Sequence, residues 1–223
     1  MRPVMIVFAK APVPGCAKTR LTGALTANEA AMLHDAFVRD TLELLQPFAA
    51  IADLELHTDI ETDAWRDLPV PRRLQHEGDL GLKMFKALEG ALQIGRPRAW
   101  ILGSDSPALP GDHLHELLRL DADVVLGPTE DGGYYAIGAH RTNREMFRNV
   151  RWSTVAVLED TIKACIGSGL TTALGPVWFD VDELADLRKL RNSKDLRQHT
   201  AAALGRLTVS AREAISACGG KRA

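Results

Sequence analysis

Apolar runs typical of buried strands alternate with amphipathic helical stretches along most of this 223-residue chain. Val4–Ala9 is an unbroken apolar run that leads into a loop rich in Pro and Gly, as expected of a strand buried in a parallel sheet. Thr26 followed by Glu29 predicts a capping box at the start of a long helix. Strands that alternate with helices predict an α/β fold, with a mostly parallel sheet covered by helices on both faces.

The later elements continue this alternation. Further strands are expected around residues 54–56, around residue 74, and at 99–103, 122–126, 134–137 and 177–181. Further helices are expected at 80–92, from Gly111, after Thr154 as a cap, and from Glu183 onward. Since no linker interrupts the pattern, we predict one domain over residues 1–223, with a core at 4–191 and a helical extension at 192–218 on its flank.

Composition excludes several classes of function. A net charge of −2 gives no electrostatic reason to expect nucleic acid or a membrane surface as a partner. Cys16, Cys165 and Cys218 are far apart, which suggests neither a disulfide framework nor a zinc site. The first apolar stretch is too short for a signal peptide and no stretch could span a membrane, so we expect a cytoplasmic protein that acts on small molecules. The oligomeric state cannot be read from these patterns.

Asp105 directly follows an apolar strand, in the stretch ILGSDSPALP. In open α/β sheets ligands gather outside the carboxyl ends of the strands, so Asp105 is well placed to hold Mg²⁺ or Mn²⁺ and, through the metal, a substrate phosphate. The alternative is that Asp105 caps the helix that begins near Gly111, or forms a turn before Pro107.

The first strand leads into the loop AKAPVPGCAKTRL, which carries Lys10, Lys18 and Arg20. Gly15 lets backbone amides approach phosphate oxygens, while the basic side chains supply countercharge. The spacing of a P-loop is absent. The loop is therefore a candidate phosphate-binding segment, with a solvated basic surface loop as the alternative.

The segment GPTEDGGYYAIG combines Glu130 and Asp131 with the paired glycines Gly132 and Gly133. Such a loop can place a ligand against the backbone, and either carboxylate could act as a general base. The alternative is an ordinary tight turn between two strands.

Two further segments contain candidate ligand-binding residues. In VWFDVDELADL, Asp180 and Asp182 lie two residues apart, hence on one face of a strand, where a shared cation would offset their repulsion. Asp182 could instead cap the next helix, so Asp180 ranks first as a metal ligand. In QHEGDLGLKM, Asp79 and Lys83 could recognise a base or a sugar, although a helix capped by Asp79 explains the same residues.

Six stretches in this order, FAKAPVPGCAKTRL, GDLGLKM, LGSDSPAL, GPTEDGGYYAIG, WSTVAVLEDT and WFDVDELADL, resemble a bacterial family of small GT-A-fold proteins. This family is related to nucleotide-diphospho-sugar transferases and is often labelled as glycosyltransferases of arsenosugar biosynthesis. The loop GCAKTRL is also similar to that of phospholactate guanylyltransferases and, more distantly, of molybdenum-cofactor nucleotidylyltransferases.

The resemblance implies a role for individual residues of this chain. Lys18 and Arg20 would hold nucleotide phosphates, Asp105 would bind the metal, and Asp180 or Asp182 would make the second metal contact. The segment 131–133 would line the acceptor or sugar pocket. Two departures are visible: the motif is SDS rather than DxD, and Lys83 stands where the family has an arginine, which keeps the charge but loses the bidentate fork.

Three functions remain open at this stage. The first is a metal-dependent glycosyltransferase that uses a nucleotide-diphospho-sugar, with Asp105, Asp131 and Lys18 as catalytic residues. The second is a nucleotidylyltransferase that joins an NMP from an NTP to a small phosphorylated substrate and releases pyrophosphate. The third is a non-catalytic nucleotide-binding module.

Overall fold

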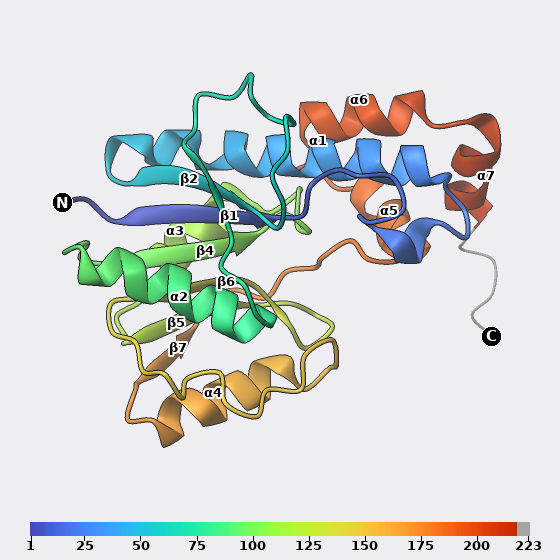
Figure 1. Ribbon diagram of the computed structural model, residues 1–223. Helices are drawn as coiled ribbons and strands as arrows, with labels where there is room; N and C mark the ends of the chain where they lie inside the picture. Colours follow the sequence, from blue (N-terminus) through green and yellow to red (C-terminus); the bar gives the residue numbers. More distant parts are fainter. Residues whose placement is uncertain (218–223) are drawn as a thin grey trace.

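The computed structural model describes residues 1–217 and contains a seven-stranded sheet of order β3-β2-β1-β4-β6-β5-β7 (Figure 1). The strands are β1 (Val4–Ala9), β2 (Asp53–Thr58), β3 (Arg72–Leu74), β4 (Ala99–Gly103), β5 (Val124–Pro128), β6 (Tyr134–Ala139) and β7 (Thr172–Leu174). The helices are α1 (Ala27–Leu45), α2 (Leu80–Gln93), α3 (Gly111–Arg119), α4 (Val157–Gly167), α5 (Leu184–Arg191), α6 (Gln198–Arg206) and α7 (Val209–Ala217). All neighbouring strands are parallel except β6, which is antiparallel to β4 and β5.

Helices cover both faces of the sheet, which explains why every residue of β1 is buried. Alternate side chains of a strand point to opposite faces. Met5 and Val7 pack with apolar residues of α1 and α3, whereas Ile6 and Phe8 pack with those of α2 and α4. The predicted fold class, a mostly parallel sheet with helices on both faces, is confirmed.

The C-terminal helices pack on the flank of this core (Figure 1). The third apolar cluster joins Phe37 of α1 to Leu187 of α5, Leu204 of α6 and Ile215 of α7. The extension predicted at 192–218 contains α6 and α7 up to residue 217, while residue 218, a cysteine, and the tail at 219–223 lie outside the described residues. None of the described helices is both long and apolar enough to cross a membrane.

The strand predicted at 177–181 is wrong. This segment makes a single isolated bridge, between Trp178 and Thr129, and the strand that completes this edge of the sheet is β7. The backbone N–H of Trp178 donates to the carbonyl of Pro128, but the N–H of Val181 donates to the carbonyl of Asp105. The segment therefore crosses from β5 to the loop after β4, and cannot form a ladder with either strand.

Two local boundaries also differ from the prediction. The fifth strand begins at Val124 and ends at Pro128, two residues later than expected at each end. The predicted cap Thr154 is wrong, because the N-cap of α4 is Ala156. The hydroxyl of Thr154 instead donates to the carbonyl of Arg151 and accepts from the N–H of Ala156, which forms a turn one step before the helix.

Candidate active site

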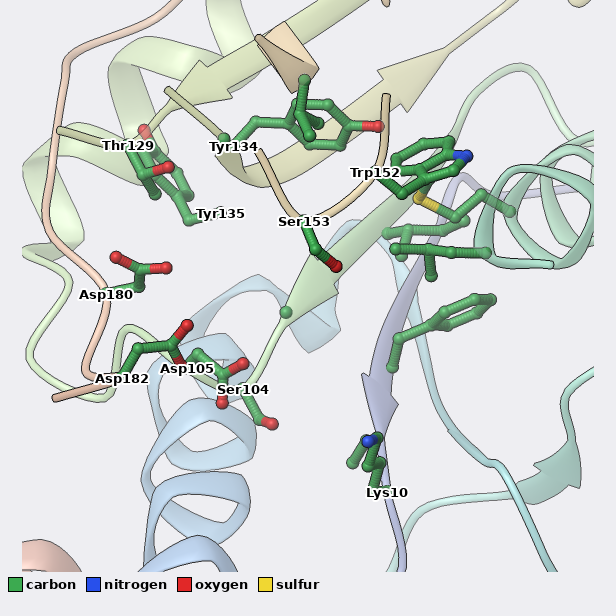
Figure 2. A pocket seen from close by; sticks show the side chains of 18 of the residues that line it. Lys10, Ser104, Asp105, Thr129, Tyr134, Tyr135, Trp152, Ser153, Asp180 and Asp182 are labelled. Atoms are coloured by element: carbon green, nitrogen blue, oxygen red, sulfur yellow. The ribbon is translucent and has the colours of Figure 1, made fainter. Parts of the chain in front are cut away.

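A cavity of about 850 Å³ opens where β1 and β4 end and β6 begins (Figure 2). Because β6 runs antiparallel to β4, its first residues lie at the same edge of the sheet as the carboxyl ends of β1 and β4. This is the edge at which open α/β sheets bind ligands. The charged side chains that line the cavity are Lys10, Lys18, Arg20, Asp59, Lys83, Asp105, Asp131, Asp180 and Asp182.

Lys18 joins two of the acidic residues. Its Nζ atom lies 2.5 Å from Oδ1 of Asp105 and 3.3 Å from Oδ1 of Asp182, and donates to the carbonyl of Val181 at 2.6 Å. The Lys18 side chain is only 4% exposed, whereas that of Asp105 is 48% exposed to the cavity. Burial opposes ionisation of Asp105, but the Lys18 charge and hydrogen bond outweigh this effect and lower the pKa of Asp105.

Asp180 stands in a different electrostatic environment from Asp105. Burial, and then the negative charges of Asp131 and Asp182, raise the pKa of Asp180 to about 6. Within residues 1–217, no basic side chain lies within 4.0 Å of its carboxylate. The carboxylates of Asp180, Asp182 and Asp105 gather on one side of the cavity (Figure 2). A cation at this position would relieve their repulsion.

Asp131 is fixed by its own loop. Its Oδ1 atom accepts hydrogen bonds from the Thr129 hydroxyl at 2.6 Å and from the Gly133 N–H at 3.0 Å. The loop needs glycine at position 132, because φ is +88° there and a Cβ would lie 2.1 Å from the carbonyl oxygen of Val155. Glu130, the other candidate base, does not line the cavity and forms an ion pair with Lys189.

The cavity brings together most of the residues singled out in the sequence, but not all. Those that line it are Lys10, Lys18, Arg20, Lys83, Asp105, Asp131, Gly133, Asp180 and Asp182. Gly15, Asp79 and Gly132 do not. Gly15 has φ +81° in a turn, and Asp79 caps α2 by accepting the N–H of Leu82 at 2.8 Å, which is the structural alternative considered above.

The alternative capping roles of Asp105 and Asp182 are wrong. The N-cap of α3 is Pro110, and that of α5 is Glu183, which forms a capping box with Asp186. Asp182 instead accepts from Lys18 and from Arg20, whose Nη1 atom lies 3.1 Å from Oδ2.

Sequence reasoning assigned no role to several residues that line the cavity. Asp59 fixes the basic loop by accepting the N–H of Ala11 at 2.7 Å. Trp152 packs against α2, where a Cβ on Gly81 would lie 3.0 Å from its ring. Ser153 follows with φ +61°, a rare conformation for serine, and Figure 2 shows its hydroxyl directed into the cavity. The stretch WST belongs to the quoted motifs, but its backbone conformation leaves no signal in the sequence.

In the described part of the chain, one group of three potential metal ligands has donor atoms within 4.8 Å of one another, and it does not contain the cavity aspartates. It consists of Asp40, Glu43 and His199. None of them lines the cavity, and Asp40 already accepts the N–H groups of His199 and Thr200 at the start of α6. These bonds explain why Asp40 is buried without invoking a metal.

Comparisons with known proteins agree with this architecture. The model of a family described as "Uncharacterized protein conserved in bacteria (DUF2064)" matches residues 42–154. A solved structure from Desulfovibrio desulfuricans G20, provisionally assigned as a nucleotide-diphospho-sugar transferase, is 31% identical with a TM-score of 0.79, and the match covers 96% of this chain and 97% of that chain. A search of the curated proteins finds no match.

Two more distant structures share the fold. CMP:2-keto-3-deoxy-manno-octonic acid synthetase complexed with CTP is 11% identical, with a TM-score of 0.53 over 85% of this chain and 96% of that chain. The inositol-1-phosphate CTP transferase from T. maritima is 12% identical, with a TM-score of 0.51 over 93% and 98%. The fold resemblance predicted from the six motifs is confirmed.

Proposed function

Because this chain belongs to the DUF2064 family of bacterial proteins, and resembles a provisionally assigned sugar transferase over nearly its whole length, we propose that it is a transferase. Its donor is a nucleotide-diphospho-sugar, and its acceptor is a small molecule with a hydroxyl group. The observation that carries the proposal is the convergence of acidic and basic side chains in one cavity of about 850 Å³, within the range of volumes typical of small-molecule sites. The proposed location is the cytoplasm, which cell fractionation tests.

The basic side chains of the cavity supply the countercharge that a diphosphate needs. Lys10, Arg20 and Lys83 come from the first loop and from α2, and line the same space as the carboxylates. As the bond to the leaving nucleoside diphosphate breaks, negative charge grows on its oxygens, and preorganised cations stabilise that charge.

A divalent metal fits the acidic side of the cavity. Asp105, Asp180 and Asp182 offer carboxylate oxygens, which Mg²⁺ and Mn²⁺ prefer, and Asp180 has no basic partner within the described residues. A bound Mg²⁺ or Mn²⁺ would neutralise the diphosphate and help it to leave.

Asp131 is the proposed base for the acceptor. Both hydrogen bonds that its carboxylate accepts within the described residues end on Oδ1, which leaves Oδ2 available to an acceptor hydroxyl. Ser153, directed into the cavity, would help to orient the acceptor.

A panel of ligands tests this proposal. We expect UDP- or GDP-sugars with Mg²⁺ or Mn²⁺ to raise the midpoint of thermal unfolding, and nucleoside triphosphates not to do so. Release of pyrophosphate from a triphosphate would contradict glycosyl transfer. Binding that is unchanged by chelators and by the substitution Asp105→Asn would instead indicate a non-catalytic nucleotide-binding module.

Nucleotidyl transfer is the second candidate, supported by one observation. Four basic side chains, Lys10, Lys18, Arg20 and Lys83, line the cavity, and a triphosphate chain offers more oxygens for them to contact than a diphosphate does. In that reaction a substrate phosphate would attack the α-phosphorus of an NTP, and positioning and electrostatics would supply most of the catalysis. The same panel separates the two reactions.

A further inference from the structure

Lys18 has no free N–H donor in the structure described here. An ammonium group has three N–H donors, and three oxygen atoms surround this one: Oδ1 of Asp105, the carbonyl of Val181 and Oδ1 of Asp182. The side chain is also 4% exposed, and it lies over the ring of Phe37. In this arrangement Lys18 cannot also bind a phosphate, although the resemblance assigns it that role.

The oxygens that hold Lys18 are also candidate metal ligands. A divalent cation bound through Oδ1 of Asp105 and Oδ1 of Asp182 would need the position that the ammonium fills. Arg20 differs in this respect. It contacts only Oδ2 of Asp182 and is 59% exposed, so it can turn away without vacating a buried position.

We propose that Lys18 is a built-in cation that occupies the Asp105–Asp182 pair in the free protein and is displaced from it when a divalent metal binds. The displaced ammonium then contacts the diphosphate that arrives with the metal, so Lys18 serves first as a counter-ion and then as a phosphate ligand. This inference rests on the proposed function, since it assumes that metal and diphosphate share the cavity.

The backbone at Lys18 is strained. Its φ is +51°, in the left-handed region, and such conformations cost a non-glycine residue about 1 kcal/mol or more. Gly15 lies three residues earlier, also with positive φ. Contacts of the Lys18 ammonium offset this strain in the conformation observed.

Binding of Mn²⁺ to the full chain, followed by electron paramagnetic resonance, tests the competition. Without phosphate ligands, we expect the Lys18→Met protein to bind Mn²⁺ about tenfold more tightly than the wild type, since no ammonium competes. Inorganic pyrophosphate should tighten Mn²⁺ binding strongly in the wild type and much less in the variant. The matched control, Lys86→Met, removes an ion pair with Glu89 on α2 outside the cavity and should change Mn²⁺ affinity by less than about threefold, as expected of an exposed ion pair.

The outcomes separate this inference from the proposed function. Equal or weaker Mn²⁺ binding by Lys18→Met overturns the competition but leaves the metal site in place. Absence of Mn²⁺ binding in every protein, with or without pyrophosphate, overturns both. If Lys18→Met does not fold, reductive methylation of lysines in the wild type provides a second test. Saturating Mn²⁺ should increase the rate of methylation of Lys18 but not of Lys10. An unchanged rate at Lys18 overturns the inference.

Discussion

At the scale of single residues, the role of an aspartate in this chain depends on its neighbours more than on its place in a motif. Asp79 and Asp105 both follow strands and both could act as caps. Asp79 caps α2, whereas the carboxylate of Asp105 contacts the ammonium group of Lys18. Local sequence therefore cannot separate the two roles, because the partner that decides the role of Asp105 is distant in the chain.

Replacing Asp105 with asparagine should abolish metal-dependent ligand binding and leave the fold intact. The amide keeps the size of the side chain but removes a charge that both Lys18 and a metal would use. Mn²⁺ titration and circular dichroism check the two halves of this prediction. An unchanged Mn²⁺ titration would refute the assignment of Asp105.

Gly132→Ala should disrupt the loop that carries Asp131. The new Cβ would face the Val155 carbonyl at 2.1 Å in a backbone with φ +88°, so we expect a loss of about 2 kcal/mol or more in unfolding free energy. Urea denaturation measures it. The matched control is Gly90→Ala in α2, where nothing lies within 4 Å of the added Cβ and a gain of about 0.5–1 kcal/mol is expected. Equal changes in unfolding free energy for the two substitutions would contradict the predicted clash at residue 132.

At the scale of helices and strands, the capping box of α1 also ties the helix to the far end of the chain. Glu29 accepts from the N–H and hydroxyl of Thr26 with Oε2, and from the N–H of Thr208 with Oε1. The hydrogen bond from Thr208, and then those from Thr26, lower the pKa of Glu29 from 4.5 to about 2, although burial opposes them.

Glu29→Gln should destabilise the protein at neutral pH by about 1–2 kcal/mol, because the amide places a donor where an acceptor is needed. Since the folded pKa is lowered, this stabilisation is fully present above pH 4.5 and is lost as the pH falls towards 2. The difference in unfolding free energy between wild type and variant, measured by urea denaturation, should therefore become smaller as the pH falls over that range. The control is Glu116→Gln, at an exposed position on α3. A difference in unfolding free energy between wild type and Glu29→Gln that stays constant with pH would contradict the role of the Glu29 carboxylate.

Element prediction succeeded where a pattern is local and failed where pairing is distant. The run in β1 and the box at Thr26 specify their own structure, and both are confirmed. Residues 177–181 have the apolar pattern of a strand. In the structure, however, the segment forms one isolated bridge with Thr129, and the N–H of Val181 then donates to the carbonyl of Asp105. Which backbone lies beside an apolar segment is a property of the assembled sheet, so alternation alone cannot specify it.

At the scale of the whole molecule, the site joins segments from both ends of the sequence. Lys18 precedes α1 and Asp182 precedes α5, yet their side chains are 3.3 Å apart. The order of β1, β4 and β6 brings the loops together. The family resemblance had implied that residues of these loops act on one ligand. The position of each side chain within the cavity, including the burial of Lys18, depends on contacts that no motif encodes.

The C-terminal helices should detach before the sheet unfolds when Asp40 is replaced with alanine. Asp40 is fully buried, and its carboxylate accepts the N–H groups of His199 and Thr200 at 3.1 and 2.7 Å, across about 160 residues of sequence. Asp40→Ala removes the acceptor for the first turn of α6 and leaves buried N–H groups unpaired, at a cost of about 1–3 kcal/mol.

Hydrogen exchange resolved by segment checks this prediction. Protection should fall over α6 and α7, at 198–217, and persist in β1 and β4, because those strands lie in apolar clusters that exclude α6 and α7. The control Glu43→Ala removes an exposed carboxylate one turn along α1, 3.9 Å from His199, and should leave protection unchanged. A uniform loss of protection across the sheet would mean that the extension and the core unfold as one unit, and that α6 is part of the cooperative structure that holds the cavity together.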